Sequence, residues 1–206
     1  FPTRRSSDLF QFLYDAAIRT MTLLCPEDVY PGPYTYKRFW FRDAALILHA
    51  ILCAGLFDLA RGVLDRFHKR QHVDGFFLSQ SGEWDSNGEA LWILRRYTEL
   101  TGTPPPREWH GMVTRGARWI ARKRTSPASD DVHGGLLPAG FSAEHLGNND
   151  YYYWDDYWSV GGLRAAAALC RSWQDSHNGE RFEKEANDLL EAIDRSLERS
   201  RAIRNH

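Results

Sequence analysis

The chain has 206 residues, which is the size of one ordinary domain or of part of a larger one. Its 26 Lys and Arg nearly balance its 27 Asp and Glu, so the formal net charge of −1 creates no field that attracts nucleic acid or anionic lipid. Hydrophobic residues make up 43% of the sequence, which excludes a disordered chain. No apolar run approaches the roughly 20 residues that span a bilayer. We therefore expect a globular protein whose partner is neither nucleic acid nor a membrane.

The three cysteines, Cys25, Cys53 and Cys170, stand singly inside apolar segments that are predicted to be helical. This spacing is typical of reduced thiols in a core and not of a disulfide framework or a zinc site. Aromatic residues are frequent, with 8 Trp, 9 Tyr and 11 Phe. Core filling alone does not account for so many rings, so some of the indoles are candidates for ligand contact.

The first nine residues, FPTRRSSDL, resemble the translation of a sequencing adapter. We expect residues 1–9 to be such an artefact and residues 10–206 to be the domain. The alternative is a real polar N-terminal arm. A secretory signal could have been lost at this end, so the sequence predicts nothing about location.

The first predicted helices cover residues 10–24 and 40–54. Beyond the first turn of the second helix only His49 is polar, which is typical of a helix buried all round, and Gly55 is well placed to end it. Residues 56–70 carry apolar side chains on one face and charges on the other, which indicates a helix with one face in water. Together these segments predict a hairpin of one buried and one amphipathic helix.

The same pair recurs twice, as residues 85–100 with 108–124 and as residues 155–173 with 179–199. Strand signals are weak, and only short pieces such as residues 75–78 are plausible strands. A repeated pair of this kind predicts an all-α fold of the toroid type, with alternating inner and outer helices.

The direction of the helices places the predicted site. If successive helices alternate in direction, the buried helices all start on one face, beside the long loops of residues 71–84 and 125–154. Long loops on a rigid scaffold are where binding and catalytic sites are usually built. The sequence therefore predicts that function lies on this one face.

Each buried helix opens on an aromatic residue and acids, with WFRD from residue 40, WDSN from residue 84 and WDDYW from residue 154. One interpretation is capping, because Asp and Asn accept hydrogen bonds from the free N–H groups of a helix start. The other is a sugar site, in which indoles stack on pyranose rings while Arg and carboxylates bind hydroxyls. The candidate sugar-binding residues are Trp40, Arg42, Asp43, Trp84, Asp85, Asn87, Trp154 and Trp158.

The segment YKRFWFRD from residue 36, which is followed by an apolar helix, resembles the Trp-x-Arg-Asp segment that opens an inner helix of glucoamylase-type glycoside hydrolases. GEWDSNG from residue 82 and YWDD from residue 153 are similar to later segments of six-hairpin glycosidases, in the same order. The resemblance covers residues 30–171 and implies part of an (α/α) six-hairpin toroid. The implied activity is inverting, exo-acting hydrolysis of an α-linked glucan or a related oligosaccharide.

The resemblance also implies roles for single residues. Arg42 and Asp43 would grip the non-reducing sugar, and Asp155, with Asp156 as its neighbour, would be the general acid. Glucoamylases proper carry Glu-Glu where this chain has Asp-Asp, and the loop carboxylate Glu144 is a second candidate for the acid. The family's general base comes from a late hairpin, so we expect a gene fragment that lacks the C-terminal half of its domain. No metal or organic cofactor is implied, because acid–base hydrolysis needs only carboxyls and water.

A general acid must be protonated before it acts, and the sequence does not decide whether Asp155 is. The N-terminus of a helix favours the ionised form. The charge of Asp156 and burial under Trp154 and Trp158 favour the protonated form.

Two other functions stay open from the sequence. Toroidal sugar epimerases rely on a pair of histidines, for which His49, His133 and His145 are the candidates. A non-catalytic carbohydrate-binding or structural helical repeat is the third interpretation. If the chain is a fragment, we expect it to self-associate and to hydrolyse no maltooligosaccharide detectably.

Overall fold

The computed structural model describes residues 6–127, 131–142 and 145–204. This part of the chain is mostly helical, as predicted, and its strands form a single antiparallel pair. The α-helices are α1 (Ser6–Leu23), α2 (Phe41–Cys53), α3 (Phe57–Leu64), α4 (Ser86–Thr101), α5 (His110–Lys123), α6 (Tyr153–Ser172) and α7 (Ser176–Arg204); the 3-10 helices are η1 (Phe67–Arg70) and η2 (Arg107–Trp109); the strands are β1 (Gly140–Ser142) and β2 (His145–Asp150).

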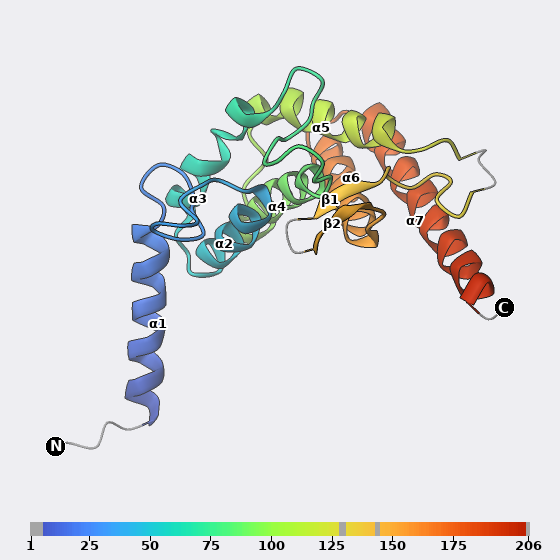
Figure 1. Cartoon of the computed structure of the whole chain (residues 1–206). Coiled ribbons are helices and arrows are strands. Elements are labelled where there is room, and N and C mark those ends of the chain that lie inside the picture. The colour runs from blue at the N-terminus through green and yellow to red at the C-terminus, as the bar shows by residue number, and fades with distance from the viewer. Residues whose placement is uncertain (1–5, 128–130, 143–144, 205–206) are drawn as a thin grey trace.

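The helices from α2 onward form two layers. The inner helices α2, α4 and α6 lie side by side, with α4 packed against both of the others. The outer helices cover them, because α3 packs on α2 and α4, α5 packs on α4 and α6, and α7 packs on α6 (Figure 1). The predicted packing of helical hairpins is therefore confirmed, but α2 is not buried all round as predicted. It exposes Leu46, Ala50 and Cys53, and Cys53 is thus not the core thiol that the sequence predicts.

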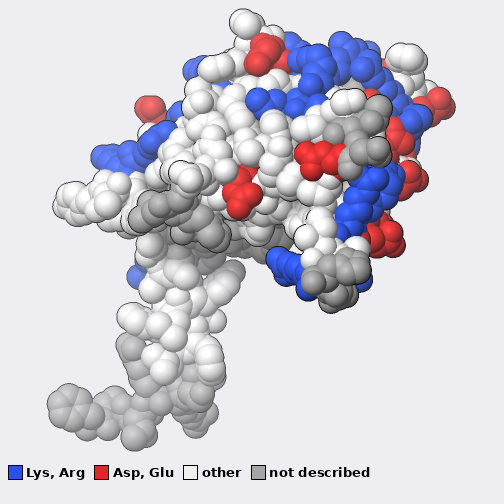
Figure 2. Space-filling model, turned by 45° about the vertical axis from the view of Figure 1, so that its right-hand side comes forward, with Lys and Arg blue, Asp and Glu red and all other residues white. Residues whose placement is uncertain are grey.

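Helix α1 projects away from this body (Figure 1). Figure 2 shows mostly uncharged side chains on the projecting part, whereas Lys and Arg gather on the upper part of the body, where α5 lies. No helix in the described ranges, α1 included, is long and apolar enough to cross a bilayer. The large apolar side chains that α1 exposes are Leu9, Phe10, Phe12, Leu13, Tyr14 and Leu23.

The segments between helices depart most from prediction. Residues 75–78 form no strand, and only an isolated bridge pairs Gln71 with Phe77. The β1–β2 hairpin was not predicted, and it docks where the Phe141 N–H donates to the Gly82 carbonyl at 2.8 Å. Gly82 has a φ of +94°, which glycine adopts without strain. Because this docking joins segments far apart in sequence, local patterning carries no signal of it.

Glycines bring α4 and α6 into direct backbone contact. A Cβ added to Gly88 would lie 2.2 Å from the Trp158 carbonyl oxygen, and a Cβ added to Gly162 would lie 2.6 Å from the Gly88 Cα. No real Cβ atom tolerates such distances, so this crossing requires glycine on both helices. The crossing lies within one turn of the start of α4 and at residues 158–162 of α6, so it fixes the distance between the two helices next to the acids of their first turns.

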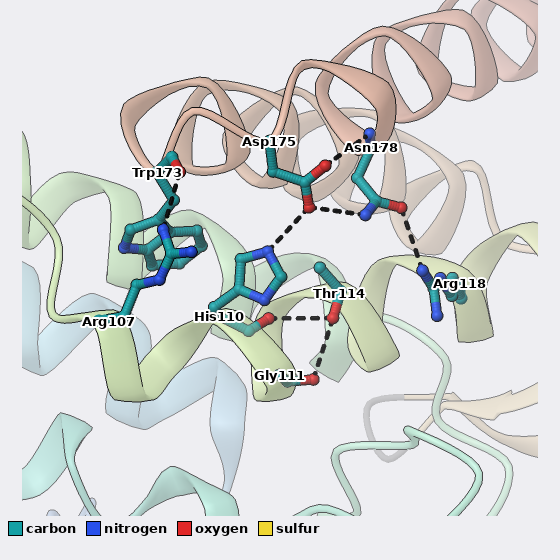
Figure 3. A network of polar contacts seen from close by, with 8 residues as sticks. All are labelled: Arg107, His110, Gly111, Thr114, Arg118, Trp173, Asp175 and Asn178. Carbon is teal, nitrogen blue, oxygen red and sulfur yellow. Dashed lines mark hydrogen bonds and ion pairs between the residues drawn. The ribbon is translucent and has the colours of Figure 1, made fainter.

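A network of polar side chains fixes the turn between α6 and α7 against α5 (Figure 3). The Asp175 carboxylate accepts hydrogen bonds from His110 Nε2 at 2.8 Å and Asn178 Nδ2 at 2.7 Å, while Arg118 donates to Asn178 Oδ1 at 3.2 Å. The side chain of Asn178 is the main cause that lowers the pKa of Asp175 to about 2. The network joins an outer helix to the third hairpin.

Within the described residues, His110, Cys170 and Asp175 also place one possible metal-ligand atom each within 4.8 Å of one another. Both oxygens of Asp175 already accept hydrogen bonds, from His110 and from the backbone and side chain of Asn178. Burial raises the pKa of the Cys170 thiol to about 12, which opposes the thiolate that a metal needs. The geometry therefore favours a structural role for this group.

Candidate active site

The carboxyl of Asp85 joins the starts of the three inner helices. Asp85 is the N-cap residue of α4 and is 2% exposed. Its Oδ2 accepts hydrogen bonds from Arg42 Nε at 2.9 Å, from Arg42 Nη2 at 2.8 Å and from Trp154 Nε1 at 2.9 Å. Arg42 lies in the first turn of α2 and Trp154 in the first turn of α6. The structure therefore brings the three helix starts together on one face.

Capping does not explain these acids. Trp40, Asp85 and Tyr152 are the N-cap residues of α2, α4 and α6, and none of them makes a side-chain cap hydrogen bond. Helix α6 begins two residues earlier than predicted, so Asp155 and Asp156 lie inside its first turn. Asp85 binds the guanidinium and the indole of two other helices instead of its own backbone. The acids thus form a cluster with tertiary partners.

Burial dominates the protonation of the two α6 acids. Desolvation, followed by the charges of Asp85 and Asp156, raises the pKa of Asp155 to about 8, and the Arg42 charge only partly opposes this. Burial raises the pKa of Asp156 to about 6, against a hydrogen bond from the Leu137 N–H at 2.9 Å. Burial and the neighbouring acids thus outweigh the charge of Arg42, and Asp155 keeps its proton to a higher pH than an ordinary carboxyl does.

Glu89 is a buried carboxyl that the sequence interpretation missed. It lies one turn after Asp85, is 0% exposed, and its Oε1 is 3.9 Å from Arg42 Nε. Burial, and then the charge of Asp85, raises the pKa of Glu89 well above its usual range. The available signal was the spacing of four residues from Asp85, which places both acids on one face of a helix predicted to be buried.

Aromatic rings continue from the acid cluster along the inner helices. The Arg42 guanidinium lies 5.7 Å from the ring centre of Trp154, which is 48% exposed. Ring centres are 5.8 Å apart between Trp154 and Trp158, 5.4 Å between Trp158 and Trp92, and 5.3 Å between Trp92 and His49. An exposed indole beside buried carboxyls is the combination that stacks on a sugar ring while polar groups bind its hydroxyls.

Two predicted sugar-binding residues lie elsewhere. Asn87 is fully buried, donates to the carbonyls of Gly75 and Gly116 at 3.0 Å each, and accepts from the Phe77 N–H at 2.8 Å. The structure therefore gives Asn87 a structural role, which ties residues 71–84 to α4 and α5, in place of the predicted sugar contact.

Trp84 also points away from the acid cluster. The Lys123 ammonium lies 3.8 Å from the centre of its ring, and the rings of Phe76 and Trp119 are 5.8 and 6.0 Å away. Its Nε1 donates to the Ala139 carbonyl at 3.4 Å. Because these contacts surround the indole, the structure assigns Trp84 to packing between α5 and the loops, in place of the predicted platform for sugar.

Replacing Asn87 by alanine is expected to destabilise the fold by about 2 kcal/mol or more. The substitution leaves the buried Phe77 N–H without its partner, which costs about 1–3 kcal/mol. It also removes one of the hydrogen bonds to the Gly75 carbonyl, which keeps Gln71 Nε2 at 3.2 Å, and one to the Gly116 carbonyl inside α5. Urea unfolding of Asn87→Ala, with the exposed Asn149→Ala as the control, measures the effect. Equal unfolding midpoints for the two variants would show that the amide of Asn87 does not hold residues 71–84 in place.

The remaining candidate site residues are Trp40, Asp43, Glu144 and the histidines of the epimerase alternative. Trp40 is half-buried, with the Arg38 guanidinium 4.9 Å from its ring centre, and Asp43 lies in the first turn of α2. Glu144 lies outside the described residues. The epimerase alternative depends on a pair of histidines. His49 contacts Trp92, and His133 stacks on Tyr151 with 3.6 Å between the ring centres, whereas the side chain of His145 lies outside the described residues.

Comparison with protein-family models, with curated proteins and with solved structures finds no match. The function is therefore inferred from the geometry of the acid cluster and from the resemblance of the three helix openings to glucoamylase-type segments.

Proposed function

We propose that the chain belongs to a glycoside hydrolase of the glucoamylase type, with its helical layers forming part of a six-hairpin toroid. The observation that carries the proposal is Asp155, a buried carboxyl whose pKa burial raises to about 8, beside the exposed indole of Trp154. A carboxyl that keeps its proton at neutral pH is what a general acid requires. Asp155 is 7% exposed and lies in the first turn of α6 beside the 48% exposed indole of Trp154, past which the sugar would approach it.

In this proposal the sugar stacks on Trp154, and Arg42 and Asp43 bind its hydroxyls. Asp155 donates its proton to the glycosidic oxygen as the C–O bond breaks. A water molecule attacks the anomeric carbon from the opposite face and gives a proton to a second, ionised carboxylate, which lies about 6.5–9.5 Å from the acid in inverting enzymes. Asp156 assists through its charge, which helps to keep the proton on Asp155. We propose an α-linked glucan or a related oligosaccharide as the substrate.

The test measures the release of glucose from maltooligosaccharides by the product of the complete gene. Asp155→Asn is expected to lower the rate by about 10²- to 10⁴-fold, because general acid catalysis contributes that much. The double variant Asp155→Asn, Asp156→Asn excludes a substitute acid. Asp194→Asn, which changes an exposed acid of α7, is the control and should keep the full rate.

A second substrate separates the acid role from a general loss of folding. Aryl glucosides with a good leaving group need little protonation, so Asp155→Asn should retain far more activity on them than on maltooligosaccharides. Full activity of Asp155→Asn on both substrates would contradict the assignment of the acid. Absence of glycoside cleavage from a folded complete product, over a panel of sugars, would contradict the function.

A further inference from the structure

Glu89 is the buried group that the proposed mechanism leaves unused. Its side chain is 0% exposed, and neither of its carboxyl oxygens accepts a hydrogen bond within the part of the chain that the structure describes. An ionised carboxylate without donors is strongly unfavourable in a core, because nothing replaces the water that it loses. The geometry alone therefore favours a neutral Glu89 that carries a proton.

The charged groups around Glu89 also favour its protonated, neutral form. Asp85 faces it from its own helix, Asp155 from α6 and Arg42 from α2. Arg42 and Asp85 already form a partly buried ion pair, with Nη2 and Oδ2 2.8 Å apart, so the charge of Arg42 is balanced by Asp85. A second anion at Glu89 would repel Asp85 and would compete for Arg42, whose Nε is 3.9 Å from Glu89 Oε1. A neutral Glu89 keeps the guanidinium on Asp85.

We propose that Glu89 is a positioning residue: its protonated carboxyl donates a hydrogen bond to Asp85 and so holds Arg42 and Trp154 on Asp85, in the arrangement that receives a sugar. The sugar contact rests on the proposed function, whereas the positioning of Arg42 and Trp154 does not. Asp85 gains a fourth donor in addition to the two N–H groups of Arg42 and the indole of Trp154. Loss of the proton from Glu89 would redistribute Arg42 between two carboxylates and loosen the indole.

The indole N–H of Trp154 provides a direct readout, because it donates to Asp85 at 2.9 Å. Its resonance in a ¹H–¹⁵N spectrum of the 206-residue chain is assigned by comparison with Trp154→Phe. Glu89→Gln keeps a neutral donor of nearly the same shape, and we expect the wild-type resonance in this variant. Glu89→Leu removes the donor, and we expect the resonance to shift. Glu99→Gln, at an exposed position of the same helix, is the matched control.

A pH titration separates positioning from simple packing. The titration is made in an Asp155→Asn background, which removes the titration of Asp155 near pH 8. There the Trp154 resonance should move as rising pH takes the proton from Glu89, whereas Asp155→Asn, Glu89→Gln should not show that transition. Maltooligosaccharide affinity supplies the second readout, with a loss of about tenfold in Glu89→Leu, comparable to one hydrogen bond, and rescue in Glu89→Gln.

Each outcome is decisive. An unchanged Trp154 resonance in Glu89→Leu, or the same pH transition in Asp155→Asn with and without Glu89→Gln, would overturn the positioning role. If Glu89→Leu does not fold, a displaced resonance in Glu89→Gln would overturn it as well, because the amide should replace the protonated carboxyl. The expected resonance shifts without sugar binding by the wild-type chain would support the role of Glu89 and count against the proposed function.

Discussion

Gly162→Ala is expected to destabilise the protein by about 3 kcal/mol or more, at the upper end of what overpacking costs. The added methyl group would lie 2.6 Å from the Gly88 Cα and 2.8 Å from the Gly88 carbonyl oxygen. Both are backbone atoms of α4, which cannot rotate away as a flexible side chain can. The two helices would have to separate, and the acid cluster at their first turns would separate with them.

The neighbouring glycine provides the control for this prediction. A Cβ added to Gly161 meets no atom within 4 Å. Gly161→Ala should therefore be neutral or should stabilise the protein by up to about 1 kcal/mol, through the higher helix propensity of alanine. Urea unfolding monitored by circular dichroism measures both variants. If both alanines shift the midpoint equally, the close crossing of α4 and α6 does not exist in solution.

Asp155→Asn is expected to raise the free energy of unfolding at pH 8 by several kcal/mol. At pH 4 the same substitution should change the free energy of unfolding little. In the folded protein the pKa of Asp155 is raised from 3.8 to about 8, so the folded state binds more protons than the unfolded state between these values. Stability then falls as pH rises from about 4 to about 8 and is constant above that range. Each unit of pKa corresponds to about 1.4 kcal/mol, which sets the scale of the effect.

Thermal unfolding of the wild type, Asp155→Asn and the control Asp194→Asn at pH 4, 6 and 8 measures this dependence. Asp156 and Glu89 also have raised pKa values, so part of the decline should remain in Asp155→Asn. Asp175 acts in the opposite direction, because its lowered pKa stabilises the fold above about pH 4. A wild-type protein whose melting temperature is the same at pH 4 and pH 8 would contradict a protonated Asp155.

The layered helices could be predicted because burial leaves a local signal. A helix that its neighbours cover on most sides, such as α2, is largely apolar, although it exposes Leu46, Ala50 and Cys53. An outer helix such as α7 instead alternates apolar and polar residues with the period of the helix. The gathering of Arg42, Asp85 and Asp155 follows from this layering and from the alternation of helix direction. These parts of the candidate site needed no knowledge of specific contacts.

The remaining features depend on contacts between distant segments. Asn87 follows Asp85 closely in a segment that resembles a sugar site, and its burial arises only because residues 71–84 fold back over it. Trp84 likewise meets Lys123 only after α5 has packed. An acid such as Glu89 near a helix start is usually solvated and stabilised by the helix dipole. Glu89 is buried because α4 and α6 cross closely at Gly88 and Gly162. The hydrophobic periodicity of the sequence does not predict this crossing.

The Oδ2 atom of Asp85, which accepts hydrogen bonds from both Arg42 and Trp154, has a consequence for the order in which the chain folds. It joins side chains that are 43 and 69 residues away in the sequence. Contacts over such separations form only after the intervening chain has been closed into loops, which is slow and entropically costly. A nascent chain with two finished hairpins has Arg42 and Asp85 in place but has neither Trp154 nor Asp155. The contacts of Asp85 with Arg42 and Trp154 are therefore completed only when the third hairpin docks on the first two.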